Sequence, residues 1–436
     1  MLSLIGFAMI AIMMYVLLKG KASALILFIG LPAIGGLLAG FSPSQIGEFA
    51  MAGIDKTSGN AVLFIFSITY FGVMNDVGMF DVLIDKLVKK AGNSVVAITV
   101  VTAIIGILGH LDGSAASTVL ITVPAMLPIY KKLNIRANVL LLIVASAMGV
   151  MNLLPWGGPT VRTAVVLGMD ANVLWKTLIP IQIIGVITTI GLAIILGLRE
   201  SKRGAGISSD SKDVAMSQVA VTVDEKVAAL KRPNLAWFNI LLTTIVIGIL
   251  VVDAIPATLA FMLALCAALV VNFKTVKEQE GRIKAHAASA LLVSATMLAS
   301  GVFVGVLNDS GMLTAMSEAV LGLIPASAGP FLHLIMGVFA LPLGMVLGTD
   351  AYFYGLLPLV IKVAETYGIT AINVALTMII GKNVALLISP LVPPTFLALG
   401  LAEIDIKEHI KFCFGWLYAI SLIMLVCGVI FGIIAI

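Results

Sequence analysis

Charged residues are scarce in this chain. Only 11% of its 436 residues are Asp, Glu, Lys or Arg, while 61% are hydrophobic. Soluble domains carry about 25% charged residues, so the composition excludes an ordinary soluble protein and predicts one that lies in a lipid bilayer. The net charge is only +4, and we expect no nucleic-acid partner.

Cysteines are few, and the familiar catalytic motifs are missing. The three cysteines, Cys266, Cys413 and Cys427, lie in apolar stretches, where we expect small buried side chains rather than a disulfide or a metal site. The sequence has no His-Glu-x-x-His, Gly-x-Ser-x-Gly or Walker A motif. We therefore expect no enzyme and no nucleotide-driven pump, and an ion gradient is the remaining energy source for transport.

The chain contains an internal repeat. Gly72–Met79 returns as Gly305–Met312, 233 positions later, with the same Asn-Asp pair in the middle. At a spacing of 235, four residues match four others: Pro155, Pro159, Thr160 and Asp170 correspond to Pro390, Pro394, Thr395 and Asp405. Two related halves of a very apolar chain are typical of transporters whose site lies where the halves meet.

We predict an all-α polytopic membrane protein with about ten spans and two re-entrant helical hairpins, built as two inverted repeats. The first repeat covers 1–198 and the second covers 233–436, joined by a hydrophilic linker at 199–232. Each repeat has one hairpin and one broken span, at 94–129 and 137–167 in the first and at 331–361 and 371–401 in the second. The pairs Asn75-Asp76 and Asn308-Asp309 are interpreted as stops after the spans Asn60–Met74 and Ala287–Leu307.

Positive charges predict the orientation. With these spans, 21 of the 26 lysines and arginines fall on one side of the membrane. Lys and Arg favour cytoplasmic loops, so this side is the cytoplasm. The linker 199–232 is then cytoplasmic, both termini are outside, and we expect the plasma membrane of a bacterial-type cell.

Four breaks in the expected helices mark the candidate site. Two are the hairpin tips around Asp112-Gly113-Ser114 and Gly348-Thr349-Asp350, and two interrupt spans at Asn152–Thr160 and Ser389–Thr395. Backbone leaves helical form at membrane depth only where it is buried in protein or lines a wet cavity. Each break frees carbonyl groups for cations and exposes half-helix N-termini for anions.

Five ionisable residues lie at or near these breaks. Asp112 and Asp350 are candidates to bind a metal or carry a proton, or alternatively to cap the tips. His110 is a candidate for titration near neutral pH, against the alternative of a packed neutral ring. Arg162 either pairs with a substrate carboxylate or anchors its helix at the membrane interface. Lys382 lies within an expected span, where it forms either a functional or a purely structural pair.

The breaks also carry a resemblance. The string Gly149–Thr160, with Pro-Trp-Gly-Gly-Pro-Thr at its end, resembles the CitMHS family of citrate–metal:proton symporters. Leu111–Thr118 and Ser389–Pro393 resemble the same family, and the similarity spans the whole chain. It implies the fold of the ion transporter superfamily, a homodimer with a scaffold domain, and a mobile domain that carries both hairpins in an elevator movement. It also implies that citrate enters with a divalent metal and is coupled to protons.

The resemblance assigns residues to a shared site for the cargo. By position, those that hold it are Asp112, Gly113, Ser114, Ser117, Thr118, Asn152, Pro155, Gly157, Gly158, Pro159, Thr160, Thr349, Asp350, Ser389, Pro393 and Thr395. One departure concerns the first tip, where the family usually has a second acidic residue in an Asp-Gly-Asp-Gly-like string. The single carboxylate of Asp112 weakens the case for a site for a bare metal ion.

The residue patterns thus predict a secondary transporter, and the resemblance implies that it imports a metal–citrate complex by proton symport, with the metal as cargo and no resident cofactor. In this reading the citrate carboxylates meet half-helix N-termini, Ser and Thr hydroxyls and Arg162, and proton sensitivity lies on Asp112, Asp350 or His110. A sodium-coupled symporter of another di- or tricarboxylate is the alternative. A channel or a membrane enzyme is the third hypothesis.

Overall fold

A computed structural model describes residues 1–206, 229–322 and 324–436, and these residues form helices and no strands. The predicted linker 199–232 lies mostly outside the described residues, and its first residues continue helix α9 as far as Lys202. The all-α prediction is confirmed for the described part of the chain.

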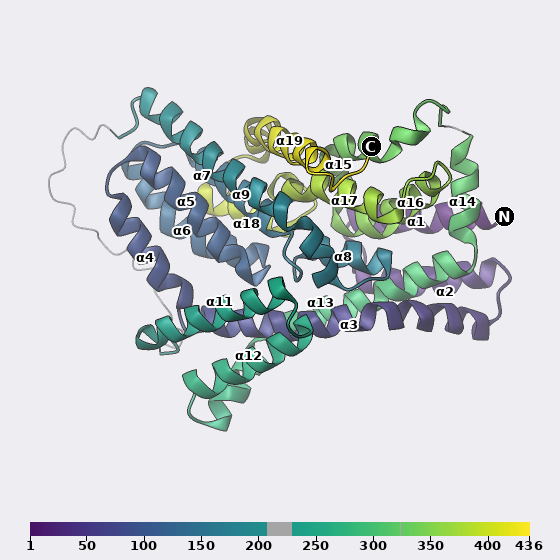
Figure 1. The fold of residues 1–436 in the computed structure, drawn as a ribbon, viewed down its shortest axis with the longest axis horizontal. Helices are drawn as coiled ribbons and strands as arrows, with labels where there is room; N and C mark the ends of the chain where they lie inside the picture. The colour runs from purple at the N-terminus through teal and green to yellow at the C-terminus, as the bar shows by residue number, and fades with distance from the viewer. Residues whose placement is uncertain (207–228, 323) are drawn as a thin grey trace.

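The helices follow the same order in both halves (Figure 1). The first half contains α1 (Leu2–Leu18), α2 (Ala24–Leu38), α3 (Pro43–Asp76), α4 (Met79–Ala91), α5 (Val95–Gly109), α6 (Ala115–Lys132), α7 (Ala137–Met151), α8 (Gly158–Leu167) and α9 (Ala171–Lys202). The second half contains α11 (Ala236–Val252), α12 (Ala257–Asn272), α13 (Val276–Asp309), α14 (Met312–Leu321), α15 (Leu332–Asp350), α16 (Leu357–Glu365), α17 (Ala371–Lys382), α18 (Pro393–Ala402) and α19 (Ile406–Ile430). Counted at the first residue, the helices of the first half have their counterparts 233 to 237 positions later, except that α16 starts 242 positions after α6 because the π-helical segment η4 (Ala351–Leu356) precedes it.

Two helices are much longer than the sequence predicted. Helices α3 and α13 each have 34 residues, and both extend far ahead of the expected spans Asn60–Met74 and Ala287–Leu307. Each begins at a capping box, in which Ser42 or Thr275 exchanges hydrogen bonds with the residue three positions on. Both end at the Asn-Asp pairs, so the predicted stops are confirmed. The short helix α14, the counterpart of α4, was missed.

Helices α3 and α13 pack antiparallel along their length, as the matching contacts at their two ends show (Figure 1). Near the start of α3, Gly53 lies against Gly305, and near its end Asp76 pairs with Arg282. In the middle, Ser294 Oγ donates a hydrogen bond of 3.0 Å to the carbonyl of Ala61. Because these helices are repeat counterparts, their antiparallel packing gives the two halves opposite directions.

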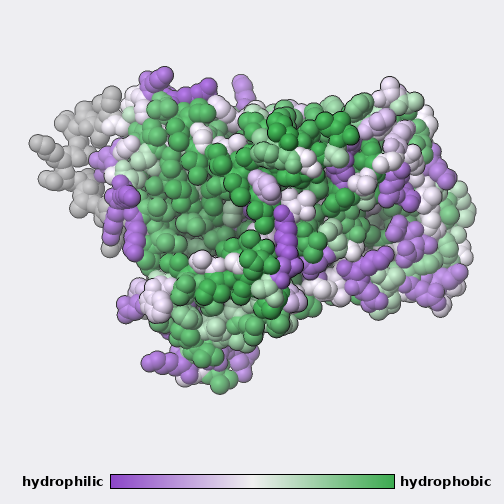
Figure 2. Space-filling view, in the orientation of Figure 1, coloured by the Kyte–Doolittle hydropathy of each residue, from purple (hydrophilic) through white to green (hydrophobic). Residues whose placement is uncertain are grey.

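The surface is suited to a bilayer. Figure 2 shows hydrophobic residues over most of the visible face, with hydrophilic residues gathered toward its ends. Eight described helices or helical runs are long and apolar enough to cross a membrane, from Pro43–Asp76 to Ile406–Ile430, and further apolar helices have 10 to 17 residues. The N-terminus and the end of α9 lie at opposite ends of the long axis (Figure 1).

Candidate functional site

The first hairpin is formed by α5 and α6, whose arms lie side by side. Thr102 Oγ1 and Tyr130 Oη share a hydrogen bond of 2.9 Å between the two arms. The tip turns at Gly113, which has a left-handed φ of 71° that favours glycine. Ser114 then caps α6 by accepting a hydrogen bond from Ser117 N at 3.2 Å, and Asp112 Oδ1 accepts from Ser114 N at 2.8 Å.

The first broken span closes onto this tip. His110 is fully buried, and its ring contacts Thr118 Oγ1 at 2.7 Å through Nδ1 and Asn152 Oδ1 at 3.0 Å through Nε2. Trp156 Nε1 donates a hydrogen bond of 2.7 Å to the carbonyl of Leu111. Both ring nitrogens of His110 therefore have partners, Nδ1 within the hairpin and Nε2 at the break, so a metal would have to replace one of these bonds.

The backbone of the first break turns sharply before α8 begins. A Cβ atom on Gly157 would lie only 2.8 Å from the carbonyl oxygen of Leu154, so this position requires glycine. Helix α8 starts at Gly158 with Pro159 in its first turn, where proline is well tolerated. Thr160 Oγ1 then donates back to the carbonyl of Asn152 at 3.2 Å, which closes the break.

The second half builds its break in a related way. Helix α17 continues into the 3₁₀ segment η5 (Asn383–Ile388) before α18 starts at Pro393. Thr395 Oγ1 donates back to the carbonyl of Leu386 at 3.3 Å, as Thr160 does in the first half. Ser389 Oγ donates to the carbonyl of Met345 at 2.9 Å, which ties this break to the arm of the second hairpin.

The two broken spans cross at repeat-related residues. Gly149 lies against Val384, which is its counterpart at a spacing of 235, and a Cβ on Gly149 would meet the Val384 side chain at 2.8 Å. Asn383 Nδ2 donates to the carbonyl of Gly149 at the same crossing. The two spans therefore meet near the pseudo-symmetry axis, as expected for a site shared between the halves.

An ion pair joins the first break to the second tip. Arg162 on α8 places Nε 2.8 Å from Asp350 Oδ1, and its Nη1 donates to the carbonyl of Gly158 at 3.1 Å. Both paired side chains are about one-fifth to one-quarter exposed, at 22% and 24%. Arg162 and Asp350 are 188 positions apart, and their pairing brings the first break and the second hairpin together.

Lys382 lies at the same tip. It is 3% exposed, and its Nζ donates to Thr349 Oγ1 at 3.1 Å and lies 5.1 Å from the centre of the Phe353 ring. Phe353 belongs to the π-helical segment η4 (Ala351–Leu356), which follows the tip. No carboxylate lies within ion-pair distance of Lys382 among the described residues.

Some polar atoms at the breaks and in the first hairpin have no partner among the described residues. The Nδ2 atom of Asn152, the Oδ1 atom of Asn383 and the hydroxyl of Thr122 are buried without a hydrogen bond in the described part of the chain. Buried polar groups are nearly always hydrogen-bonded, so these atoms are candidates to contact a ligand. Asn383 was missed from the sequence, although it follows Lys382 inside an apolar stretch.

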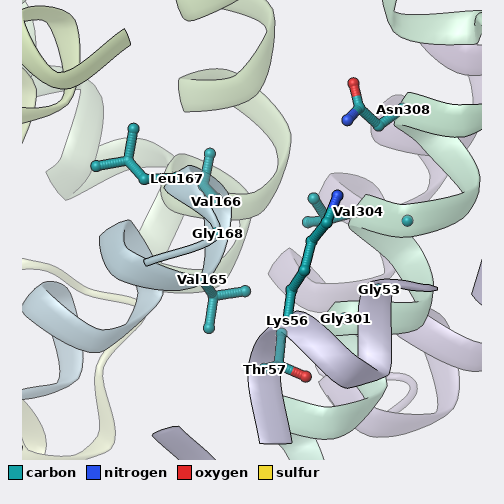
Figure 3. Close-up of a pocket in the computed structure, with 11 residues that line it drawn as sticks. Gly53, Lys56, Thr57, Val165, Val166, Leu167, Gly168, Gly301, Val304 and Asn308 are labelled. Carbon is teal, nitrogen blue, oxygen red and sulfur yellow. The ribbon is translucent and has the colours of Figure 1, made fainter. Parts of the chain in front are cut away.

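A cavity of about 210 Å³ lies beside the breaks, between α3, α13 and the end of α8. Figure 3 shows Lys56 extending into it between Val165 and Val304, with Asn308 further along α13. None of the predicted site residues lines this cavity. Across the described residues, no group of three or more His, Cys, Asp or Glu side chains could hold a metal ion.

Comparisons with known proteins decide the family. The profile of the CitMHS family, described as citrate transporter, matches residues 2–381. The chain belongs to the CitMHS family. The resemblance read from its breaks is thereby confirmed, and this family member is a membrane transporter rather than an enzyme.

Two Bacillus subtilis (strain 168) relatives match over the full length of both chains. One, a citrate transporter, is 38% identical, and the other, a Mg²⁺/citrate complex secondary transporter, is 35% identical. Among solved structures, the YdaH transporter of Alcanivorax borkumensis, described as having an unusual topology, is similar with a TM-score of 0.60. That match covers 90% of each chain at 15% identity. It therefore supports only the fold of this CitMHS protein and not its substrate.

Proposed function

We propose that this protein imports citrate as a complex with a divalent metal, coupled to protons. The observation that carries the proposal is the convergence of breaks from both halves, joined by the Arg162–Asp350 pair of 2.8 Å. Convergent breaks of this kind bind substrates and coupling ions in secondary transporters. The Mg²⁺/citrate transporter among the relatives supports a metal complex as the cargo.

The chemistry of the site suits a metal–citrate complex better than free citrate or a bare divalent ion. Free citrate carries several negative charges whose desolvation is costly, and a divalent metal offsets part of that charge. A bare divalent ion needs several oxygen ligands, yet the described residues offer no cluster of three acidic or imidazole side chains. In the proposed cargo, citrate itself supplies most of the metal ligands.

Alternating access, orientation and assembly belong to the same proposal. The hairpins and broken spans would move together as an elevator against a scaffold that includes the antiparallel α3–α13 pair. The N-terminus and the end of α9 lie at opposite ends of the molecule, which supports an outer N-terminus and a cytoplasmic linker at 199–232 (Figure 1). The C-terminus is proposed to be outside as well. We propose a homodimer in the plasma membrane, with the two repeats at 1–198 and 233–436.

The direct test is uptake of labelled citrate into proteoliposomes, with an inward proton gradient and with or without Mg²⁺. The proposal expects uptake that requires both the gradient and the metal. In the same assay Asp112→Asn and Asp350→Asn should reduce uptake while the protein stays folded. Wild-type kinetics and pH dependence in both variants would refute a role for the tips.

A sodium-coupled carboxylate symporter is the second candidate. The lack of an acidic cluster among described residues favours it, because Na⁺ is bound by carbonyl and hydroxyl oxygens such as those of Ser114 and Thr118. Uptake that depends on Na⁺ and is indifferent to divalent metal would select this candidate.

A further inference from the structure

The two hairpin tips share one backbone plan. Gly113 and Gly348 are counterparts at a spacing of 235, and both have a left-handed φ, 71° and 72°. A hydroxyl residue follows each of them, Ser114 in the first tip and Thr349 in the second. The scaffold of the two subsites is therefore repeated.

The charges of the tips are not repeated. At the same spacing of 235, Asp112 corresponds to Leu347, and Asp350 corresponds to Ala115. The two basic residues near the second tip also lack counterparts, because Arg162 corresponds to Leu397 and Lys382 corresponds to Ala147. Each of these four charged side chains is thus replaced by an apolar side chain at the equivalent place.

The second tip has one positive charge in excess. Asp350 is matched by Arg162 at 2.8 Å, which leaves the buried ammonium of Lys382 with a hydroxyl and an aromatic ring as its partners. The aliphatic part of Lys382 lies on Gly344, where a Cβ would come 3.2 Å from the lysine Cδ. A buried ammonium is costly unless it is paired, so this tip is suited to an anion.

The first tip has the opposite charge. Asp112 forms no ion pair with any described residue, and one of its carboxylate oxygens accepts a single backbone hydrogen bond, from Ser114. Hydroxyl and carbonyl oxygens of Ser114 and Thr118 lie in the same turn. Oxygen atoms with one negative charge suit a hard cation that brings its other ligands with it.

A short segment connects the two tips. Trp156 contacts the first tip through the carbonyl of Leu111, and Arg162, six positions later, contacts the second tip through Asp350. Only Gly158–Arg162 of this segment is helical, and its four steps rise about 6 Å, so one short segment reaches both tips. The buried unpartnered amide atoms of Asn152 and Asn383 lie on the broken spans next to this segment.

We propose that the site is polarised and binds its cargo in one orientation. Asp112 at the first tip takes the metal end of the complex, and Arg162 with Lys382 at the second tip takes a carboxylate that does not coordinate the metal. This inference rests on the proposed transport of metal–citrate and adds the placement of each end.

Equilibrium binding of labelled citrate to the purified full-length protein in lipid nanodiscs tests the polarity. The probes are Mg²⁺–citrate and Ca²⁺–citrate, whose metals differ in size and coordination. Asp112→Asn should change the ratio of the two affinities severalfold, because it alters the group next to the metal. Lys382→Met should weaken both complexes about tenfold and leave their ratio unchanged.

Two controls carry the same changes of charge far from the tips. Asp81→Asn and Lys362→Met alter surface residues that form exposed ion pairs, and neither should change affinity or ratio. Thr349→Val removes the oxygen partner of Lys382 without altering charge, and it should lower both affinities by a smaller factor. It replaces Lys382→Met as the test if that variant does not fold.

The outcomes separate the two proposals. A ratio that changes with Lys382→Met or Thr349→Val but not with Asp112→Asn reverses the polarity and overturns the inference. Unchanged binding in all tip variants overturns it as well. Wild-type protein that binds neither metal complex overturns the proposed function, and the polarised site with it.

Discussion

The α3–α13 pair and the two hairpin tips use the internal repeat in different ways. In the helix pair the close contacts occur twice. Gly72 of α3 faces His286 of α13, and Gly305 of α13 faces Gly53 of α3. Gly305 is the counterpart of Gly72 at a spacing of 233, and His286 is the counterpart of Gly53. At the tips only the backbone repeats, while the charges differ. Packing of two like helices is satisfied by symmetry, but an asymmetric ligand requires a site whose two ends differ.

The largest expected effect comes from filling the contact between α3 and α13. A Cβ on Gly301 would lie 2.6 Å from Thr57 Oγ1 and 2.7 Å from the carbonyl oxygen of Gly53. Gly301→Val should therefore lower the free energy of unfolding by about 3 kcal/mol, because overpacking forces the backbones apart. The measurement is reversible unfolding in mixed detergent micelles.

The matched control lies on the same pair of helices. Gly59 on α3 has nothing within 4 Å of its Cβ position, so Gly59→Val should change stability by less than about 0.5 kcal/mol. If both variants lost the same free energy of unfolding, the helix propensity of valine would explain the loss, and the close contact between α3 and α13 would not.

The next effect concerns the second tip. Asp350→Ala leaves Arg162 and Lys382 near each other without a carboxylate, and we expect a loss of about 2 kcal/mol, reduced by the partial exposure of the pair. Arg162→Met combined with Asp350→Ala should recover part of this loss, because it removes the unpaired cation. A double-mutant cycle on unfolding free energies measures the coupling. Strictly additive losses would show that the pair does not stabilise the junction of the halves.

The positions of the breaks could be predicted from the sequence, but their partners could not. Pro and Gly within apolar stretches interrupt helices locally, so Gly113, Gly157 and Gly348 could be identified without a structure. The Arg162–Asp350 pair depends on how α8 meets a hairpin 188 positions away, and no local pattern specifies that contact. Similarly, the aromatic partner of Lys382 lies in η4, whose π-helical form the sequence did not indicate.

The lengths of α3 and α13 show a different limit. Hydropathy placed their starts near Asn60 and Ala287, because the preceding turns are polar. The capping boxes at Ser42 and Thr275 are local signals, and they could have located the true starts. The family, in contrast, could be recognised from a dozen residues around the first break.

A smaller effect tests where the helix pair itself departs from symmetry. Asp76 at the end of α3 accepts from His286 Nε2 at 2.8 Å and from Arg282 Nη1 at 3.3 Å, whereas its counterpart Asp309 forms no ion pair in the described structure. Asp76→Asn should destabilise the protein by about 1 kcal/mol, and Asp309→Asn should have little effect. Thermal unfolding of the two variants compares them directly. Equal shifts would show that the cluster at Asp76 adds no stability.

The smallest effect is expected at an exposed ion pair between the halves, and it should depend on pH. Lys176 Nζ lies 2.5 Å from Asp253 Oδ2, and this hydrogen bond holds the pKa of the Asp253 carboxyl below its usual value. A carboxyl with a depressed pKa in the folded state adds stability above its unfolded pKa of about 3.9, and that stability is lost as pH falls through the lower folded value.

Lys176→Met should therefore lower the unfolding temperature slightly at pH 7, and the difference from wild type should shrink as Asp253 becomes protonated below about pH 4. Asn172 Nδ2 also donates to Asp253 Oδ1, at 3.2 Å, and remains in the variant, so part of the depression should persist. A difference that stays constant across this pH range would assign the effect to the packing of the lysine chain instead of its charge. Packing would then hold this contact, as it does where the glycines of α3 and α13 cross, and not charge as at the tips.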